Sequence, residues 1–110
     1  MNDLRIATAQ FEHRDGDKAY NLARVETLTR RAVEAGAQIV SFHEGCIPAY
    51  SWLQPLSKSQ LADVAEPVPD GPSVRELIRI ASDYRTIIMA GLIEQDSGHL
   101  YNTYVTVSPE

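Results

Sequence analysis

The sequence predicts an α/β fold with the element order β-α-β-loop-α-β-β. Short apolar, β-branched runs alternate with two stretches whose apolar residues recur at three- and four-residue spacing. Strands separated by helices usually lie parallel, with right-handed crossovers. The runs at 86–93 and 100–107 are separated by a short turn that contains Asp-Ser-Gly, so they should form an antiparallel hairpin.

The first half of the chain is predicted to form a strand, a helix and a second strand. The first strand covers residues 4–11 (LRIATAQF), and Asp17 is placed to cap the helix that follows. Gly36 stands where a left-handed C-terminal cap is wanted, and the run AQIVSF after it is typical of a buried strand. The apolar face of this helix should comprise Leu22, Val25, Leu28, Ala32 and Val33.

A loop and a second long helix are predicted next. Residues 43–56 (HEGCIPAYSWLQPL) have the period of neither a helix nor a strand, and indicate an ordered loop. Ser57 and Gln60 have the spacing of a capping box before a short helical stretch. The segment EPVPDGP is predicted to be a loop that cannot propagate a helix. Its last residue, Pro72, suits the first position of the next helix. The apolar stripe of that helix should comprise Val74, Leu77, Ile78, Ala81 and Tyr84.

Composition limits the class of protein. A chain of 110 residues has the size of one domain, and 44% hydrophobic with 23% charged residues is typical of a globular one. A formal net charge of −5 argues against a dedicated nucleic-acid-binding domain. One cysteine fits a reducing compartment, and no signal-peptide core or membrane-length apolar run is present. We therefore expect a soluble, cytoplasmic protein with no nucleic-acid or membrane partner.

The end of the sequence predicts that residues 1–110 are a single incomplete domain. The chain stops at Ser-Pro-Glu, just beyond a strand, with no helix or cap to close the domain. The central strands are apolar on both sides, so helices on one face leave open what covers the other face.

Residues able to do chemistry follow the second predicted strand. His43, Glu44 and Cys46 come directly after it, and open α/β sheets bind ligands beyond the carboxyl ends of their strands. A carboxylate at the mouth of a mostly apolar site is partly desolvated, which suits it to general-base work. The commoner role of such a residue is to cap the loop by accepting backbone N–H bonds, and residue type alone leaves both roles open.

The cysteine and the other histidines are weaker candidates. Cys46 lies three positions from His43, and closeness in a loop does not by itself align a thiol nucleophile with its base. We expect Cys46 to be a small buried residue instead. His13 and His99 lie in turn-like segments and are expected to be solvent-exposed. The sequence has no metal-ligand spacing and no glycine-rich phosphate loop.

Two aromatic residues flank the same loop. Tyr50 and Trp52 are candidates for the wall of a substrate pocket, and either side chain could equally anchor the loop to the core.

The order of these segments resembles the start of the nitrilase superfamily of carbon–nitrogen hydrolases. LRIATAQF, a helix and IVSFHEG..IPAYSW are similar to the opening of that family, in which the second strand typically ends in Phe/Leu-Pro-Glu before an aromatic loop. The later run GPSVRELIRIASDYRTIIMAGLIEQDSGHLYNTYVTVSPE is similar to its next helix, its G-x-x-E strand and its Y-N-x-x strand. The resemblance spans nearly the whole chain, and His43 stands where the family usually has proline.

The resemblance implies the N-terminal part of an αββα sandwich, in which a second sheet covers the other face. In residues 1–110 alone, the face formed by the strands near Ile6, Val40 and Ile88 should then lack its covering layer. Such a chain should aggregate, dimerise through that face, or be ordered only within a longer polypeptide. It implies a homo-oligomeric amidohydrolase that needs no cofactor and cleaves non-peptide carbon–nitrogen bonds of small molecules, amides more often than nitriles or carbamoyl compounds. A Glu-Lys-Cys set, commonly with a second glutamate, would act through a thioester intermediate. Glu44 matches the general-base glutamate, whereas Cys46 does not match the nucleophile. The family's Lys and Cys fall beyond residue 110, so this piece alone should be inactive.

Two other classes of protein stay open. One is a non-catalytic α/β module that binds a small ligand or a partner protein through the loop around Trp52. The other is a flavodoxin-like receiver or nucleotide domain. Such a domain would require a phosphate loop, which the sequence lacks, and strict alternation of strands and helices in place of the terminal hairpin. A lysine soon after residue 110, followed later by a cysteine at a strand end, would favour the enzyme.

Overall fold

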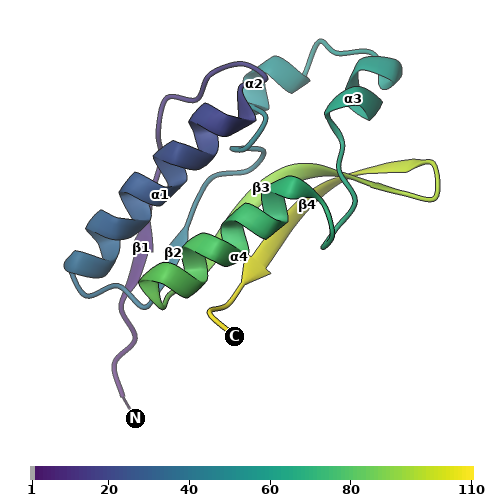
Figure 1. The fold of residues 1–110 in the computed structure, drawn as a ribbon. Coiled ribbons are helices and arrows are strands. Elements are labelled where there is room, and N and C mark those ends of the chain that lie inside the picture. The colour runs from purple at the N-terminus through teal and green to yellow at the C-terminus, as the bar shows by residue number, and fades with distance from the viewer. Residues whose placement is uncertain (1) are drawn as a thin grey trace.

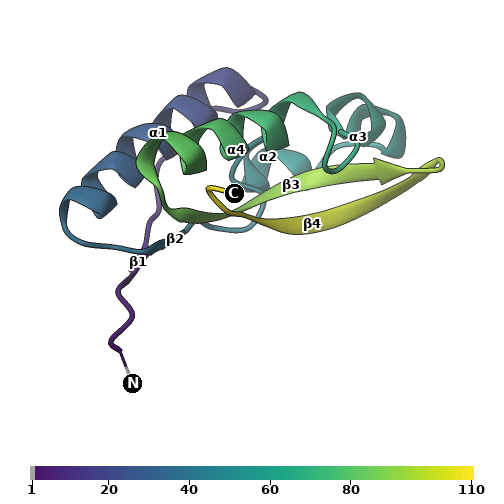
Figure 2. The same ribbon diagram turned by 60° about the horizontal axis from the view of Figure 1, so that its bottom comes forward.

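A computed structural model describes residues 2–110 and confirms the α/β class. The elements are β1 (Ile6–Thr8), α1 (Lys18–Glu34), β2 (Ile39–Ser41), α2 (Tyr50–Leu53), α3 (Lys58–Val64), α4 (Pro72–Tyr84), β3 (Ile87–Asp96) and β4 (His99–Val107). They form one sheet in the order β1-β2-β3-β4, in which the first two pairs are parallel and β3–β4 is antiparallel, as predicted. The long helices α1 and α4 lie side by side on one face of this sheet (Figures 1 and 2).

Helix α1 begins and ends where the sequence predicted. The Asp17 side chain caps it by accepting a hydrogen bond from the Tyr20 N–H at 3.0 Å. After the helix, Gly36 has a φ of 93°, and its N–H donates to the Val33 carbonyl at 2.9 Å. The positive φ turns the chain towards β2 and favours glycine, because a side chain there would be strained.

The predicted ends of α3 and α4 are also confirmed. The Ser57 hydroxyl accepts from the Gln60 N–H, and the Gln60 side chain accepts from the Ser57 N–H, which completes the capping box. Pro72 is the first residue of α4. The apolar stripe predicted for α4 is partly wrong, however, because Ile80 is fully buried and Ile78 is exposed beside β4. The helix is rotated so that Ser73, Val74, Leu77, Ile80 and Ala81 face the core.

Element lengths differ from the prediction where pairing decides them. Strand β1 keeps three residues of the predicted eight, because it is an edge strand paired only with β2. Strand β3 runs three residues further than predicted, to Asp96, because β4 pairs with it up to the turn at Ser97 and Gly98. The loop between β2 and α3 contains the one-turn helix α2, which has no period long enough to be recognised in the sequence.

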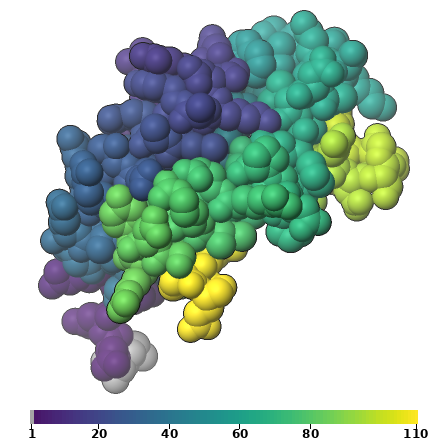
Figure 3. Space-filling model, viewed as in Figure 1, coloured from purple at the N-terminus to yellow at the C-terminus, as the bar shows by residue number. Residues whose placement is uncertain are grey.

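The core lies between the two long helices and one face of the sheet. Val40, Ile88 and Leu92 of the sheet are buried there against Val25 and Leu77 of the helices. In the space-filling view α1 and α4 form a continuous surface, and the tip of the β3–β4 hairpin extends beyond it (Figure 3). Within residues 2–110 no helix is both long and apolar enough to cross a membrane.

The other face of the sheet, here called the open face, carries no helix within residues 2–110 (Figure 2). Alternation along the strands places on it, exposed or half-buried, Ile6, Ile39, Ile87, Met89, Tyr104 and Thr106. The expected uncovered face is therefore present, although the side chains of Val40 and Ile88 themselves point into the core.

Candidate active site

Glu44 lies at the carboxyl end of β2, in the turn that follows the strand. Its side chain is exposed, and its Oε1 accepts a hydrogen bond from the side-chain amide of Asn102 on β4, 58 residues away. No backbone N–H of residues 2–110 donates to this carboxylate, so Glu44 does not cap the loop. The partial desolvation expected from the sequence is not seen within residues 2–110, because the Glu44 side chain is exposed there.

The backbone of Glu44 crosses β3 at a glycine. A Cβ on Gly91 would lie 2.2 Å from the Gly45 nitrogen, 3.0 Å from the Glu44 carbonyl carbon and 3.2 Å from the Glu44 Cα. Any side chain at position 91 would therefore collide with this turn. Gly91 pairs with Tyr104, an exposed residue of the open face, so Glu44 passes over the sheet on that face.

Tyr104 fastens the chain just before the turn. Its hydroxyl donates to the Phe42 carbonyl at 2.5 Å and lies 2.8 Å from the Ser41 hydroxyl. Its ring therefore spans β3 from β4 to reach the end of β2. Tyr104 and Asn102 are two residues apart on one face of β4, and they hold points two residues apart, the Phe42 backbone and the Glu44 carboxylate.

The two aromatic candidates have different surroundings. Tyr50 and Asn102 line a hollow of about 200 Å³, whose other walls are Leu53, Gln54, Leu61 and Ile93. Trp52 instead packs on the loop before α1, where a Cβ on Gly16 would lie 2.9 Å from its ring. The structure thus places Tyr50 beside the residue that binds Glu44, and Trp52 as an anchor between two loops.

Cys46 is fully buried in the core, as the sequence predicted. Burial raises the pKa of its thiol to about 11, so the thiol is protonated at neutral pH. A protonated, enclosed thiol is a poor nucleophile.

The His43 ring packs against the loop after β1. Its ring centroid lies 5.1 Å from that of Phe11 and 5.5 Å from that of His13. Burial, and then the neighbouring His13, lower the pKa of His43, so the imidazole is neutral near pH 7. The expected exposure of His13 is wrong, because this contact half-buries it, whereas His99 is exposed as predicted.

A buried ionic cluster joins the loop before α4 to α1. The Glu66 carboxylate accepts from Lys18 Nζ at 2.6 Å, from the Ser73 N–H at 2.8 Å and from the Ser73 hydroxyl at 2.6 Å. Burial raises the pKa of Glu66, but the hydrogen bonds from Lys18 and Ser73 outweigh burial and hold the pKa below its ordinary value. Both oxygens of this carboxylate accept hydrogen bonds inside the fold, and these bonds tie the loop before α4 to α1.

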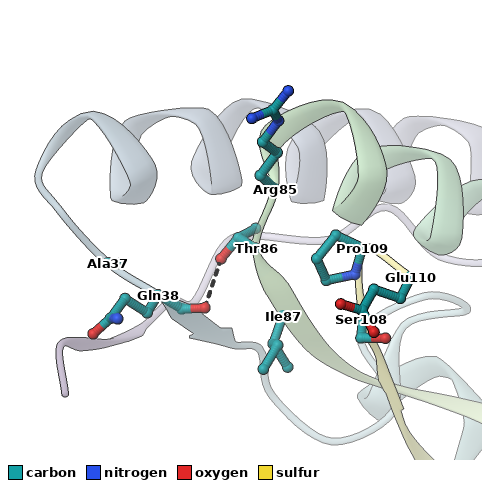
Figure 4. Close-up of a pocket in the computed structure, with 8 residues that line it drawn as sticks. All are labelled: Ala37, Gln38, Arg85, Thr86, Ile87, Ser108, Pro109 and Glu110. Atoms are coloured by element: carbon teal, nitrogen blue, oxygen red, sulfur yellow. Dashed lines mark hydrogen bonds between the residues drawn. The ribbon is translucent and has the colours of Figure 1, made fainter.

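A larger hollow, of about 440 Å³, lies at the opposite end of the sheet (Figure 4). It is lined by the residues just before β2, by residues 85–87 at the start of β3 and by residues 108–110, and the Thr86 hydroxyl donates to the Gln38 carbonyl at 2.9 Å. The Arg85 side chain extends away from the other labelled residues in Figure 4. This hollow is at the amino ends of the parallel strands, remote from Glu44, and we do not assign it a role in the chemistry.

Asn102 and Gly91 are the site residues that sequence reasoning did not assign. Both stand in the motifs that carried the resemblance, Asn102 in Y-N-x-x and Gly91 in G-x-x-E. Their contacts with Glu44 depend on the register of the β3–β4 hairpin, in which Gly91 pairs with Tyr104 and Ile93 with Asn102.

A single helical layer on one face of a mixed four-stranded sheet, with no helix on the other face within residues 2–110, is the arrangement of one half of an αββα sandwich. Over residues 5–110 the chain matches the carbon–nitrogen hydrolase family, and it belongs to that family. It is 33% identical over 108 residues to an (R)-stereoselective amidase of Pseudomonas sp, covering 97% of this chain and 36% of the relative. It is 36% identical over 111 residues to omega-amidase NIT2 of Bos taurus, covering 100% of this chain and 37% of the relative.

A solved structure similar to this chain is an N-terminal amidase with a Gln-Val peptide, at a TM-score of 0.80 and 19% identity over 96% of this chain and 25% of that one. The fold is thus a partial αββα sandwich of the nitrilase type. The chain spans little more than a third of the length of the curated relatives.

Proposed function

We propose that residues 1–110 are the N-terminal portion of a carbon–nitrogen hydrolase domain in which Glu44 is the general base. The observation that carries the proposal is the exposed Glu44 carboxylate at the carboxyl end of β2, held by Asn102 from the neighbouring hairpin. A general base must have a carboxylate oxygen within reach of a reacting proton, and the exposed side chain of Glu44 meets that need.

The catalytic cycle requires a thiol and a lysine from beyond residue 110. Glu44 takes the proton of that thiol as the sulfur attacks the amide carbon, and the lysine stabilises the negative oxygen that forms. Glu44 then returns the proton to the leaving nitrogen, which departs as ammonia or an amine. Finally Glu44 deprotonates a water that cleaves the thioester, releasing the acid and the free thiol. Cys46 takes no part, because it is buried and protonated.

The substrate we propose is a small amide, with nitriles and carbamoyl compounds as less favoured classes. Amidases and an omega-amidase are among the relatives, together with enzymes named nitrilase. We propose that Tyr50 lines the substrate pocket and that Trp52 acts on the same pocket by anchoring its loop. A panel of simple amide, ω-amide, nitrile and carbamoyl substrates on the full-length protein tests this choice. Ammonia release from the nitrile alone would overturn it.

The test of the general base is Glu44→Gln in the full-length protein. The variant keeps the shape of the side chain and removes its basicity, so turnover should fall about 10²–10⁴-fold. Glu34→Gln is a matched control, because Glu34 is exposed at the end of α1 and forms no ion pair within residues 2–110. Equal unfolding midpoints of both variants would show that the fold is intact. Near-normal turnover of Glu44→Gln would refute the assignment.

We further propose that the full-length protein is a cytoplasmic homodimer or higher homo-oligomer that works without a cofactor. The open face and the edge strands offer surface that further chain or a second copy would cover. Light scattering of the purified full-length protein gives the oligomeric state, and a monodisperse monomer would contradict this proposal.

A further inference from the structure

The Glu44 side chain is held by a residue of a distant strand. Asn102 lies in β4 and pairs with Ile93 of β3, and its side-chain amide donates to Glu44 Oε1. The ladder between β3 and β4 is continuous from Ile88–Val107 to Asp96–His99, so the backbone of Asn102 is fixed. The carboxylate is thereby bound to the sheet, although Glu44 itself stands in a turn.

The same strand fixes the backbone leading into that turn. Tyr104 binds the Phe42 carbonyl, and Asn102 binds the Glu44 carboxylate two residues later. Strand period places both β4 side chains on the open face. Together they restrain Glu44 at its backbone and at its carboxylate, whereas an exposed glutamate in a turn otherwise samples many rotamers.

The chemistry of the donor suits this task. A neutral amide makes a charge-assisted hydrogen bond to a carboxylate and leaves its negative charge in place. A lysine or arginine in the same position would neutralise that charge. It also occupies only Oε1, so Oε2 has no hydrogen-bond partner within residues 2–110. We propose that Asn102 is a positioning residue, which holds Glu44 with one oxygen directed to the reacting proton. The inference rests on the proposed role of Glu44 as general base.

The test is a double-mutant cycle in the full-length protein. Asn102→Ala should lower kcat about 10- to 100-fold with little change in KM, because a displaced base slows the chemistry more than it weakens binding. In the Glu44→Gln background the same change should cause no further loss. Asn102→Asp should be less active than Asn102→Ala, because it sets a second carboxylate against Glu44. Gln95→Ala is the matched control, since this exposed amide of β3 makes no side-chain hydrogen bond within residues 2–110.

The outcomes separate the inference from the function on which it rests. If Glu44→Gln is inactive while Asn102→Ala keeps turnover within about threefold of the wild type, the inference alone is overturned. The inference also falls if Asn102→Ala costs the same factor with and without Glu44, because Asn102 would then act independently. Near-normal turnover of Glu44→Gln overturns the proposed function and this inference with it. An isosteric Asn102→Asp variant more active than Asn102→Ala would indicate a structural role only.

Discussion

The position of Glu44 can be tested by adding a single carbon atom, the Cβ of alanine, at Gly91. In Gly91→Ala the new Cβ would lie 2.2 Å from the Gly45 nitrogen, and ordinary contact begins at 3.4 Å. The turn must therefore retreat by about 1.2 Å, and it carries the Glu44 Cα, which is also within 3.2 Å of the new atom. A misplacement of about 1 Å in catalytic geometry can cost on the order of 100-fold in rate. The same overpacking should lower the free energy of unfolding by about 1–3 kcal/mol.

The assay is kcat/KM for amide hydrolysis by the full-length protein, with urea unfolding measured in parallel. Gly98→Ala is the control, because a Cβ there meets nothing within 4 Å while its positive φ still costs stability. We expect Gly98→Ala to lose stability but keep its activity, and Gly91→Ala to lose both. If Gly91→Ala hydrolyses the substrate within about twofold of the wild type, the turn is not held against β3 as described, and the reasoning is wrong.

Three further predictions concern the rest of the chain. Glu66→Gln should lower the free energy of unfolding by about 3 kcal/mol, the lower end for a broken buried pair, because Lys18 can regain some hydration. The stability contributed by the Glu66 carboxylate is complete above the pKa of the unfolded carboxyl and is lost as the pH falls through the lower pKa of the folded state. The free energies of unfolding of Glu66→Gln and the wild type, measured in urea, should therefore converge as the pH is lowered. A difference that stays constant with pH would contradict this. Cys46 should react with iodoacetamide only after unfolding, and Cys46→Ala should keep its turnover; alkylation of the folded protein would refute the burial argument. Ser57→Ala should cost about 1 kcal/mol in the same unfolding assay by removing the α3 cap, and an unchanged midpoint would show that the capping box adds nothing.

Local chemistry explains which parts of the fold could be predicted from the sequence. Helix ends followed from side chains that act within a few residues, such as Asp17 at the start of α1 and Gly36 after its end. The exposure of Ile78 and the burial of Ile80 could not be predicted, because the rotation of α4 about its own axis, set by packing on the sheet, decides them. The buried Glu66 was likewise out of reach, since its partners Lys18 and Ser73 meet only in the folded chain.

The candidate site divides in the same way. Glu44 could be placed because it directly follows an apolar run that had to be a strand, and its neighbour Cys46 could be identified as a core residue from its apolar surroundings. The role of Asn102 could not be found, because its contact with Glu44 depends on the register of a hairpin 58 residues along the chain. The sequence therefore showed the motif that contains Asn102, but not the hydrogen bond from Asn102 to Glu44.

The most direct test of the general-base proposal is a crystal structure of the full-length protein with a substrate analogue bound. We predict that a Glu44 carboxylate oxygen lies within hydrogen-bond reach of the nucleophilic thiol, about 2.6–3.2 Å for an oxygen partner and somewhat longer to sulfur. We also predict that the Asn102 amide stays on the other oxygen. A Glu44 carboxylate turned away from the thiol, with another acidic side chain in its place, would contradict the account.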